Sequence, residues 1–88
     1  MHFIAIGDQM ASELEIQASF IHLRRALKSG EAARLVKDAG MTTTAVGEVC
    51  LVSQPTAWCW LAGRQFPKRD AAIRLAQLLE ILTVVHGA

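Results

Sequence analysis

Cysteine, histidine and proline are scarce in this sequence. Its 88 residues include two cysteines, three histidines and two prolines. The cysteines, Cys50 and Cys59, have a spacing that matches no zinc or thiol redox motif, and the scattered histidines do not complete one. We therefore interpret both thiols as reduced, and we expect no metal and no cofactor.

Patterns that carry catalysis are missing as well. The sequence has no nucleophile paired with a base, no glycine-rich loop that could cradle a phosphate and no cluster of metal ligands. We expect that the chain is not an enzyme.

Long hydrophobic runs are absent. No stretch approaches the roughly 18 consecutive apolar residues that a membrane span needs. The first residues also lack a basic segment followed by the long apolar run of a signal peptide. We therefore expect a cytoplasmic protein without a membrane partner.

An excess of charge of one sign is absent too, because the formal net charge is only +1. No overall basic field therefore indicates nucleic acid, and the distribution of charge has to be read instead. Residues 51–69 contain Arg64, Lys68 and Arg69 and no acidic residue, whereas three acidic residues precede the first basic one. This distribution predicts a local positive face around residues 51–69.

Apolar residues, by contrast, are abundant. They make up 52% of the chain, which is a high fraction for one small domain with much surface to cover. We expect a single domain over residues 1–88 that associates with a second copy of itself. Residues 1–29 would form an arm and a helix, residues 30–82 the core, and residues 83–88 a tail.

The N-terminal part predicts one long helix. Residues 2–6 are short and apolar, and form either a strand or a tucked-in arm. Asp8 could cap a helix over residues 9–28, which contains neither Gly nor Pro. One apolar face of this helix consists of Ile16, Phe20, Leu23 and Leu27. A second stripe lies about 120° away and is formed by Met10, Leu14 and Ile21. This second stripe either widens the core face or meets another protomer.

Four further helices follow from capping signals and periodicity. Ser29 and Gly30 interrupt the pattern before a helix over residues 31–39. Thr42 is a good N-cap for residues 43–50, and this helix would direct Val46, Val49 and Cys50 inward. Gly47 in its middle costs about 1 kcal/mol relative to alanine, which favours a close approach of the following helix.

The next helix covers residues 54–62, and either Ser53 or Gln54 is its cap because Pro55 disfavours helical dihedrals in the preceding residue. After Gly63 and Pro67 a last helix covers residues 68–82. Its apolar faces consist of Ile73, Leu75, Ala76, Leu78, Leu79 and Leu82. The β-branched residues after it could add a short strand. The predicted fold is all-α, with five helices and short terminal strands as an option.

A set of residues at fixed spacing carries a resemblance to a known family. Its members are Gly40, Met41, Thr42, Thr43, Val46, Gly47, Cys50, Val52, Ser53, Trp60, Gly63 and Pro67. In this pattern residues 31–82 resemble the Cro and phage-repressor class of helix-turn-helix domains. The resemblance implies a lambda-repressor-like fold with an added N-terminal helix and the helix-turn-helix at about residues 42–62. It further implies a bacterial cytoplasmic protein that a phage could encode.

Two positions depart from the family pattern. Leu51 stands where the family has glycine in the turn, and a leucine at positive φ is strained, so we expect a turn of another shape. Ala57 replaces a larger core residue of the recognition helix and leaves volume to be filled. Both departures indicate a repacked interface between the two helices.

The resemblance assigns roles to outward residues. In such domains the start of the recognition helix reads base edges, while the preceding helix and the flanking loops hold phosphates. The implied base contacts are Gln54, Pro55, Trp58 and Cys59. The implied phosphate contacts are Thr43, Thr44, Ser53, Arg64, Gln65, Lys68 and Arg69.

Some of these side chains have an alternative interpretation. Trp58 could instead pack against the N-terminal helix or a partner, whereas Trp60 is expected in the core. Arg24, Arg25 and Lys28 are more typical of a solvated helix surface than of a DNA contact.

Two functions follow as hypotheses. The first is a sequence-specific transcriptional regulator that binds double-stranded DNA as a homodimer, occupies an operator and blocks transcription. Met10, Leu14 and Ile21 would contribute to the dimer or partner surface. The second is a protein-interaction module, such as an antitoxin or anti-repressor, that uses its apolar surface to hold a partner.

Overall fold

A computed structural model describes the backbone of residues 2–86 and the side chains of residues 13–85. The described chain consists of α1 (His2–Ser29), α2 (Glu31–Asp38), α3 (Thr43–Cys50), α4 (Gln54–Leu61) and α5 (Arg69–His86). Residues 2–86 contain no strand. The all-α prediction is therefore confirmed for this part of the chain.

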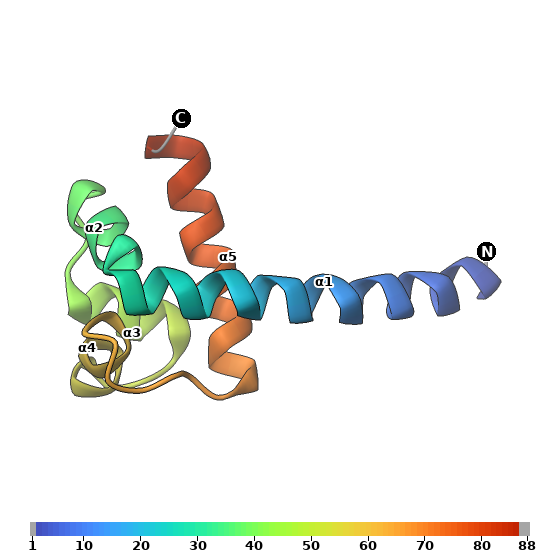
Figure 1. The fold of residues 1–88 in the computed structure, drawn as a ribbon, viewed down its shortest axis with the longest axis horizontal. Coiled ribbons are helices and arrows are strands. Elements are labelled where there is room, and N and C mark those ends of the chain that lie inside the picture. Colours follow the sequence, from blue (N-terminus) through green and yellow to red (C-terminus); the bar gives the residue numbers. More distant parts are fainter. Residues whose placement is uncertain (1, 87–88) are drawn as a thin grey trace.

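Helix α1 is longer than predicted. It begins at His2, so the expected strand or arm at residues 2–6 is wrong, and Asp8 lies inside the helix and does not cap it. The residues before Asp8 include no proline, and the cost of a single interior glycine, about 1 kcal/mol, does not end a helix. In Figure 1 the C-terminal half of α1 lies against the other helices, while its N-terminal half projects beyond them.

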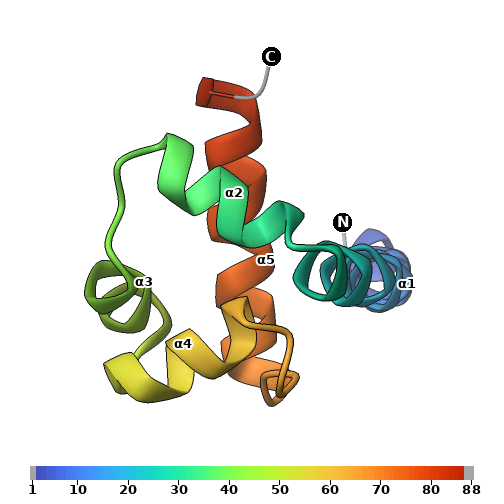
Figure 2. The same cartoon turned by 60° about the vertical axis from the view of Figure 1, so that its left-hand side comes forward.

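Helix α5 is the centre of the packing. It contacts α1, α2 and α3, and Figure 2 shows α1 end-on on one side of it, α3 and α4 on the other side, and α2 crossing in front of it. The buried core residues from the five helices are Leu23, Leu27, Ala32, Val36, Val46, Cys50, Ala57, Trp60, Ala71, Ala72, Leu75, Leu78, Leu79 and Leu82. The predicted core face of α1 is confirmed in part, since Leu23 and Leu27 are buried and Ile16 and Phe20 are half-buried.

The C-terminal strand is also wrong within the described residues, because α5 continues to His86. The hydroxyl of Thr83 donates a hydrogen bond to the Leu79 carbonyl over 2.8 Å, and Leu82 is buried. Tertiary packing therefore outweighs the weak helix propensity of the β-branched residues. Residues 87 and 88 of the predicted strand lie outside the described residues.

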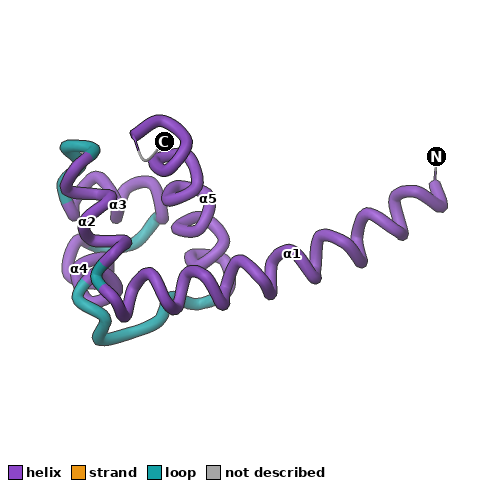
Figure 3. Tube along the Cα trace, turned by 45° about the horizontal axis from the view of Figure 1, so that its top comes forward, coloured by secondary structure: helices purple, strands orange, loops and turns teal. Residues whose placement is uncertain are grey.

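The junctions between the helices are short loops (Figure 3). Gly30 separates α1 from α2 with a left-handed φ of 84° and is the N-cap of α2, while the Ser29 hydroxyl accepts a hydrogen bond from the Glu31 N–H over 3.3 Å. The Thr42 hydroxyl accepts one from the Ala45 N–H over 3.1 Å. The predicted cap of α3 is thereby confirmed, and α3 ends at Cys50 as predicted.

Candidate nucleic-acid interface

A tight turn at residues 51–53 joins α3 to α4. Leu51 has φ 62° and ψ 42°, which is the left-handed conformation. The Val52 N–H donates to the Gly47 carbonyl over 2.8 Å, and the Leu51 N–H donates to the Glu48 carbonyl over 3.3 Å. The expectation of a turn with another shape is therefore wrong, because these hydrogen bonds hold the left-handed turn despite the leucine.

Gly47 lies directly beneath this turn. A Cβ atom added at Gly47 would stand 2.8 Å from the Val52 carbonyl oxygen and 3.3 Å from the Ser53 carbonyl oxygen. The predicted close approach is confirmed, and the approaching atoms belong to the backbone that leads into α4. The absence of a side chain at Gly47 thus sets how closely α3 and α4 pack.

One inward residue predicted for α3 is wrong. Val46 and Cys50 are buried, but Val49 is 47% exposed. At 100° per residue Val46, Gly47 and Cys50 share one face of the helix, and Val49 lies about 105° from the centre of that face. The two turns of α3 therefore have room for only one buried stripe.

Ser53 is the N-cap of α4, which decides between the two predicted caps. Its hydroxyl accepts from the Thr56 N–H over 3.4 Å and lies 2.9 Å from the Thr56 hydroxyl. Gln54 is then the first helical residue, and Pro55 occupies the first turn, where a missing N–H costs nothing. Helix α4 ends at Leu61, one residue earlier than predicted.

The outer face of α4 carries the predicted base contacts. Ala57 and Trp60 are buried, so Trp60 belongs to the core as expected. Gln54, Pro55 and Trp58 are exposed and Cys59 is half-buried. Burial of one face of α4 thus leaves the four predicted base-contacting residues on or beside its open face.

Trp58 has a specific environment. Its side chain is 46% exposed, and the Arg64 Cζ atom lies 5.1 Å from the centre of its ring. It also borders a hollow of about 430 Å³ between α2, α3 and α4, together with Lys37 and Thr43. Because α4 packs chiefly against α3, the alternative in which Trp58 packs on α1 is not the arrangement found.

The predicted phosphate contacts lie on the surface around α3 and α4. Thr44, Ser53, Arg64, Gln65 and Lys68 are exposed, and Thr43 is half-buried. Arg69 differs, since its Nη2 atom donates to both carboxylate oxygens of Glu13 on α1, over 3.2 and 2.8 Å. A guanidinium that already holds a carboxylate is a weaker phosphate candidate than its neighbours.

Lys37 is a basic residue of this surface that the sequence interpretation assigned no role. It lies one helical turn before Gly40 and borders the same hollow as Thr43 and Trp58, and no acidic residue lines that hollow. No sequence signal indicated this position, because Lys37 and Thr43 are brought together by the packing of α2 beside α3.

The two thiols occupy different surroundings. Cys50 is buried and Cys59 is half-buried, and neither forms a disulfide. Burial raises the pKa of the Cys50 thiol above the ordinary value of 9.0, and the nearby positive charge of Arg74 partly opposes this shift. Among the described residues no group of three or more His, Cys, Asp or Glu side chains could hold a metal ion.

Large apolar side chains are exposed at two places away from α4. Leu14 and Ile21 of the second stripe of α1 are 68% and 55% exposed. Ile81, Val84 and Val85 are exposed on the last turns of α5. The third residue of the predicted partner surface, Met10, lies outside the described side chains.

None of the described helices is long and apolar enough to cross a membrane. Comparisons of the chain with protein families, with curated proteins and with solved structures find no match. Only the geometry and chemistry of the described residues therefore bear on function.

Proposed function

We propose that the chain is a sequence-specific DNA-binding regulator that presents α4 to the major groove and acts as a homodimer on an operator, where it blocks transcription. The observation that carries the proposal is the α3, turn and α4 unit. Gly47 and the left-handed turn hold two short helices in close contact. The outer face of the second helix is then open to a ligand.

The chemistry of that open face supports the proposal. Gln54 is exposed at the first turn of α4, and a glutamine side chain can pair with adenine through two hydrogen bonds. Arg64 and Lys68 are exposed nearby, in a stretch that lacks acidic residues from residue 51 to residue 69. A duplex seated on α4 would therefore meet hydrogen-bonding groups at its bases and positive charge at its backbone.

Selection of bound sites from random duplex DNA tests the proposal, followed by gel-shift titration of the selected site at 50 and 200 mM salt. We expect affinity to fall steeply with salt, because bound counterions are released from neutralised phosphates. Gln54→Ala should change the preferred sequence, whereas Lys68→Gln should weaken binding to all sequences and flatten the salt dependence. Arg34→Gln on the outer side of α2 is the matched control. Equal salt slopes for the wild type and Lys68→Gln would contradict the assignment of Lys68.

A protein-interaction module is the second candidate function. The exposed apolar side chains of α1 and of the last turns of α5 favour it, since such surface is typical of protein interfaces. The same titration separates the two functions. Failure to bind any selected duplex, together with formation of a defined complex with another protein, would favour this second function.

A further inference from the structure

A small basic hollow lies where the C-terminal end of α1 meets the segment after α4. It measures about 110 Å³ and is bordered by Arg24, Lys28, Arg64 and Gln65, with Leu27, Gly63 and Phe66 completing the lining. No acidic residue lines it. Arg24 and Lys28 lie one turn apart on α1, whereas Arg64 comes from the segment after α4, so only the fold brings Arg64 to the other two basic side chains.

Close backbone contact fixes the two walls of the basic hollow. Gly63 has φ 76°, and a Cβ atom added there would stand 3.3 Å from the Leu27 carbonyl oxygen. The Gly63 N–H donates to the Trp60 carbonyl over 3.0 Å, and the Arg64 N–H donates to the Cys59 carbonyl over 2.9 Å. The segment that carries Arg64 is thus anchored both to α4 and against α1.

Both arginines of the hollow are stacked on aromatic rings. The Arg24 Cζ atom lies 4.5 Å from the centre of the Phe66 ring, and the Arg64 Cζ atom lies 5.1 Å from the centre of the Trp58 ring. Phe66 is itself held edge-on by Phe20, with ring centres 6.1 Å apart. Stacking restrains a guanidinium while leaving the N–H donors at its edge free to bind an anion.

The cations of the hollow have no carboxylate partner within the part of the chain that the structure describes, because the only ion pair there joins Arg69 to Glu13. The hollow therefore combines two restrained guanidinium groups, the ammonium group of Lys28, a neutral amide and no negative charge. Its volume of about 110 Å³ leaves room for an anion of the size of a phosphate group.

We propose that this basic hollow binds a backbone phosphate of duplex DNA beside the bases that α4 contacts. The inference rests on the proposed function and adds α1 to the DNA-binding surface. Arg64 connects the basic hollow to the outer face of α4, since it borders the hollow and stacks on Trp58 of that face. Arg24 and Lys28 were expected on a solvated helix surface. In this proposal their side chains contact the phosphate.

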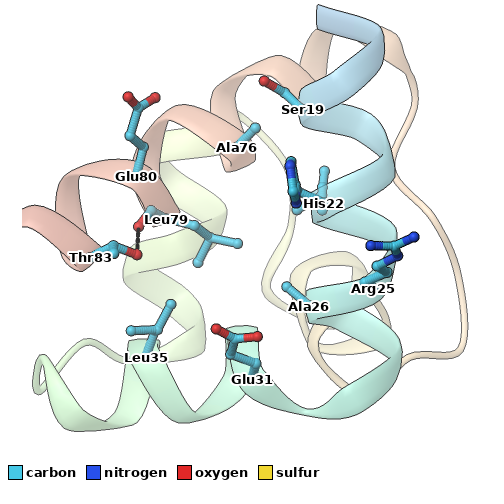
Figure 4. A pocket seen from close by; sticks show the side chains of 11 residues that line it. Ser19, His22, Arg25, Ala26, Glu31, Leu35, Ala76, Leu79, Glu80 and Thr83 are labelled. Carbon is cyan, nitrogen blue, oxygen red and sulfur yellow. Dashed lines mark hydrogen bonds between the residues drawn. The ribbon is translucent and has the colours of Figure 1, made fainter. Parts of the chain in front are cut away.

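Arg25 is the matched control. It is exposed and adjacent to Arg24 in sequence, but it borders a different hollow, between α1, α2 and α5, together with Glu31 and Glu80 (Figure 4). Arg24→Gln and Arg25→Gln remove the same charge from the same helix. A difference between them therefore reports contact with phosphate and not the change in net charge.

The test measures gel-shift affinity for the selected duplex from 50 to 200 mM salt for Arg24→Gln, Lys28→Gln, Arg64→Gln, the triple variant and Arg25→Gln. Each phosphate contact contributes about 0.9 to the slope of log affinity against log salt. Because one phosphate is held by all three side chains, over this fourfold change in salt the triple variant should lose about threefold less affinity than the wild type, and each single variant should lose a part of that difference. Arg25→Gln should keep the wild-type slope.

The outcomes distinguish failure of the phosphate site from failure of the proposed function. Wild-type slopes for Arg24→Gln and Lys28→Gln, in variants whose thermal unfolding matches the wild type, would overturn the phosphate site while leaving DNA binding intact. Equal losses for Arg24→Gln and Arg25→Gln would also overturn it, because a general charge effect would explain both. Absence of wild-type binding to any duplex would overturn the proposed function itself.

Discussion

Leu51 is the residue with the most unusual backbone conformation in the described chain, since no other non-glycine residue there has a positive φ. Its side chain is 72% exposed, so it gains little from burial in return for this conformation. An L-residue in the left-handed region costs roughly 1–2 kcal/mol. The cost is local and should be removable by substitution.

Leu51→Gly should therefore stabilise the protein by about 0.5–1 kcal/mol, because glycine removes the backbone strain but loses more conformational entropy on folding. Urea unfolding followed by circular dichroism measures the change. Leu51→Ala is the control, since it removes the same exposed side chain and keeps the strained Cβ. Equal midpoints for the two variants would show that the backbone at Leu51 stores no strain.

The buried thiol of Cys50 provides a second prediction at the residue scale. Its pKa is raised above 9.0 in the folded protein, chiefly by burial, so the unfolded chain loses this proton at lower pH than the folded one. Stability from Cys50 is fully present below about pH 9 and falls as pH rises from 9 through the folded pKa.

Wild-type protein should thus lose free energy of unfolding between pH 8 and 10, and Cys50→Ala should lose less over the same range. Urea titrations at a series of pH values measure this. If the free energy of unfolding of Cys50→Ala falls with pH as steeply as that of the wild type, Cys50 is not the cause of the fall.

At the scale of elements, the junction of α3 with α4 depends on the missing side chain of Gly47. Alanine would improve helix propensity by about 1 kcal/mol. Its Cβ atom, however, would stand 2.8 Å from the Val52 carbonyl oxygen, and backbone atoms cannot rotate away as a side chain can. Overpacking of this kind costs typically about 1–3 kcal/mol, so the clash should dominate.

Gly47→Ala is therefore expected to destabilise the protein by up to about 2 kcal/mol, measured by thermal or urea unfolding. Glu48→Ala, at the exposed neighbouring position, should change stability by less than about 0.5 kcal/mol. A Gly47→Ala variant that is more stable than the wild type would mean that helix propensity outweighs the contact with the turn.

The helices that were predicted well are those with local signals. The caps Thr42 and Ser53 and the breaks at Gly30 and Gly63 depend on neighbouring residues, so sequence located these boundaries to within about two residues. The shape of the turn at Leu51 was predicted wrongly because hydrogen bonds to the carbonyls of α3 decide it. The basic hollow could not be predicted, because Arg24 and Arg64 meet only after α1 has packed against the segment that follows α4.

At the scale of the whole molecule, large apolar side chains remain exposed on the surface of a single copy. Leu14 and Ile21 lie on one stripe of α1, and Figure 1 shows the N-terminal half of this helix projecting from the other helices. Burial of an exposed leucine or isoleucine stabilises an assembly by roughly 1.5–3 kcal/mol. Pairing of this stripe with a second copy would cover it.

We predict that the wild type sediments at twice the chain mass of 9.6 kDa at micromolar concentration, and that the double variant Leu14→Gln with Ile21→Gln sediments at the chain mass. Analytical ultracentrifugation over a range of concentrations measures this. Ile81→Gln with Val84→Gln is the matched control at the other exposed apolar surface. If only that control pair disrupts the dimer, α5 and not α1 forms the interface.

The contrast between the two tryptophans has a spectroscopic consequence. Trp60 is 3% exposed and Trp58 is 46% exposed, so a dissolved collisional quencher such as acrylamide reaches mainly the Trp58 indole. The quenchable part of the intrinsic fluorescence therefore reports on the outer face of α4 without any added label. A ligand that covers this face shields Trp58 from the quencher, whereas a ligand that binds elsewhere leaves the quenching unchanged.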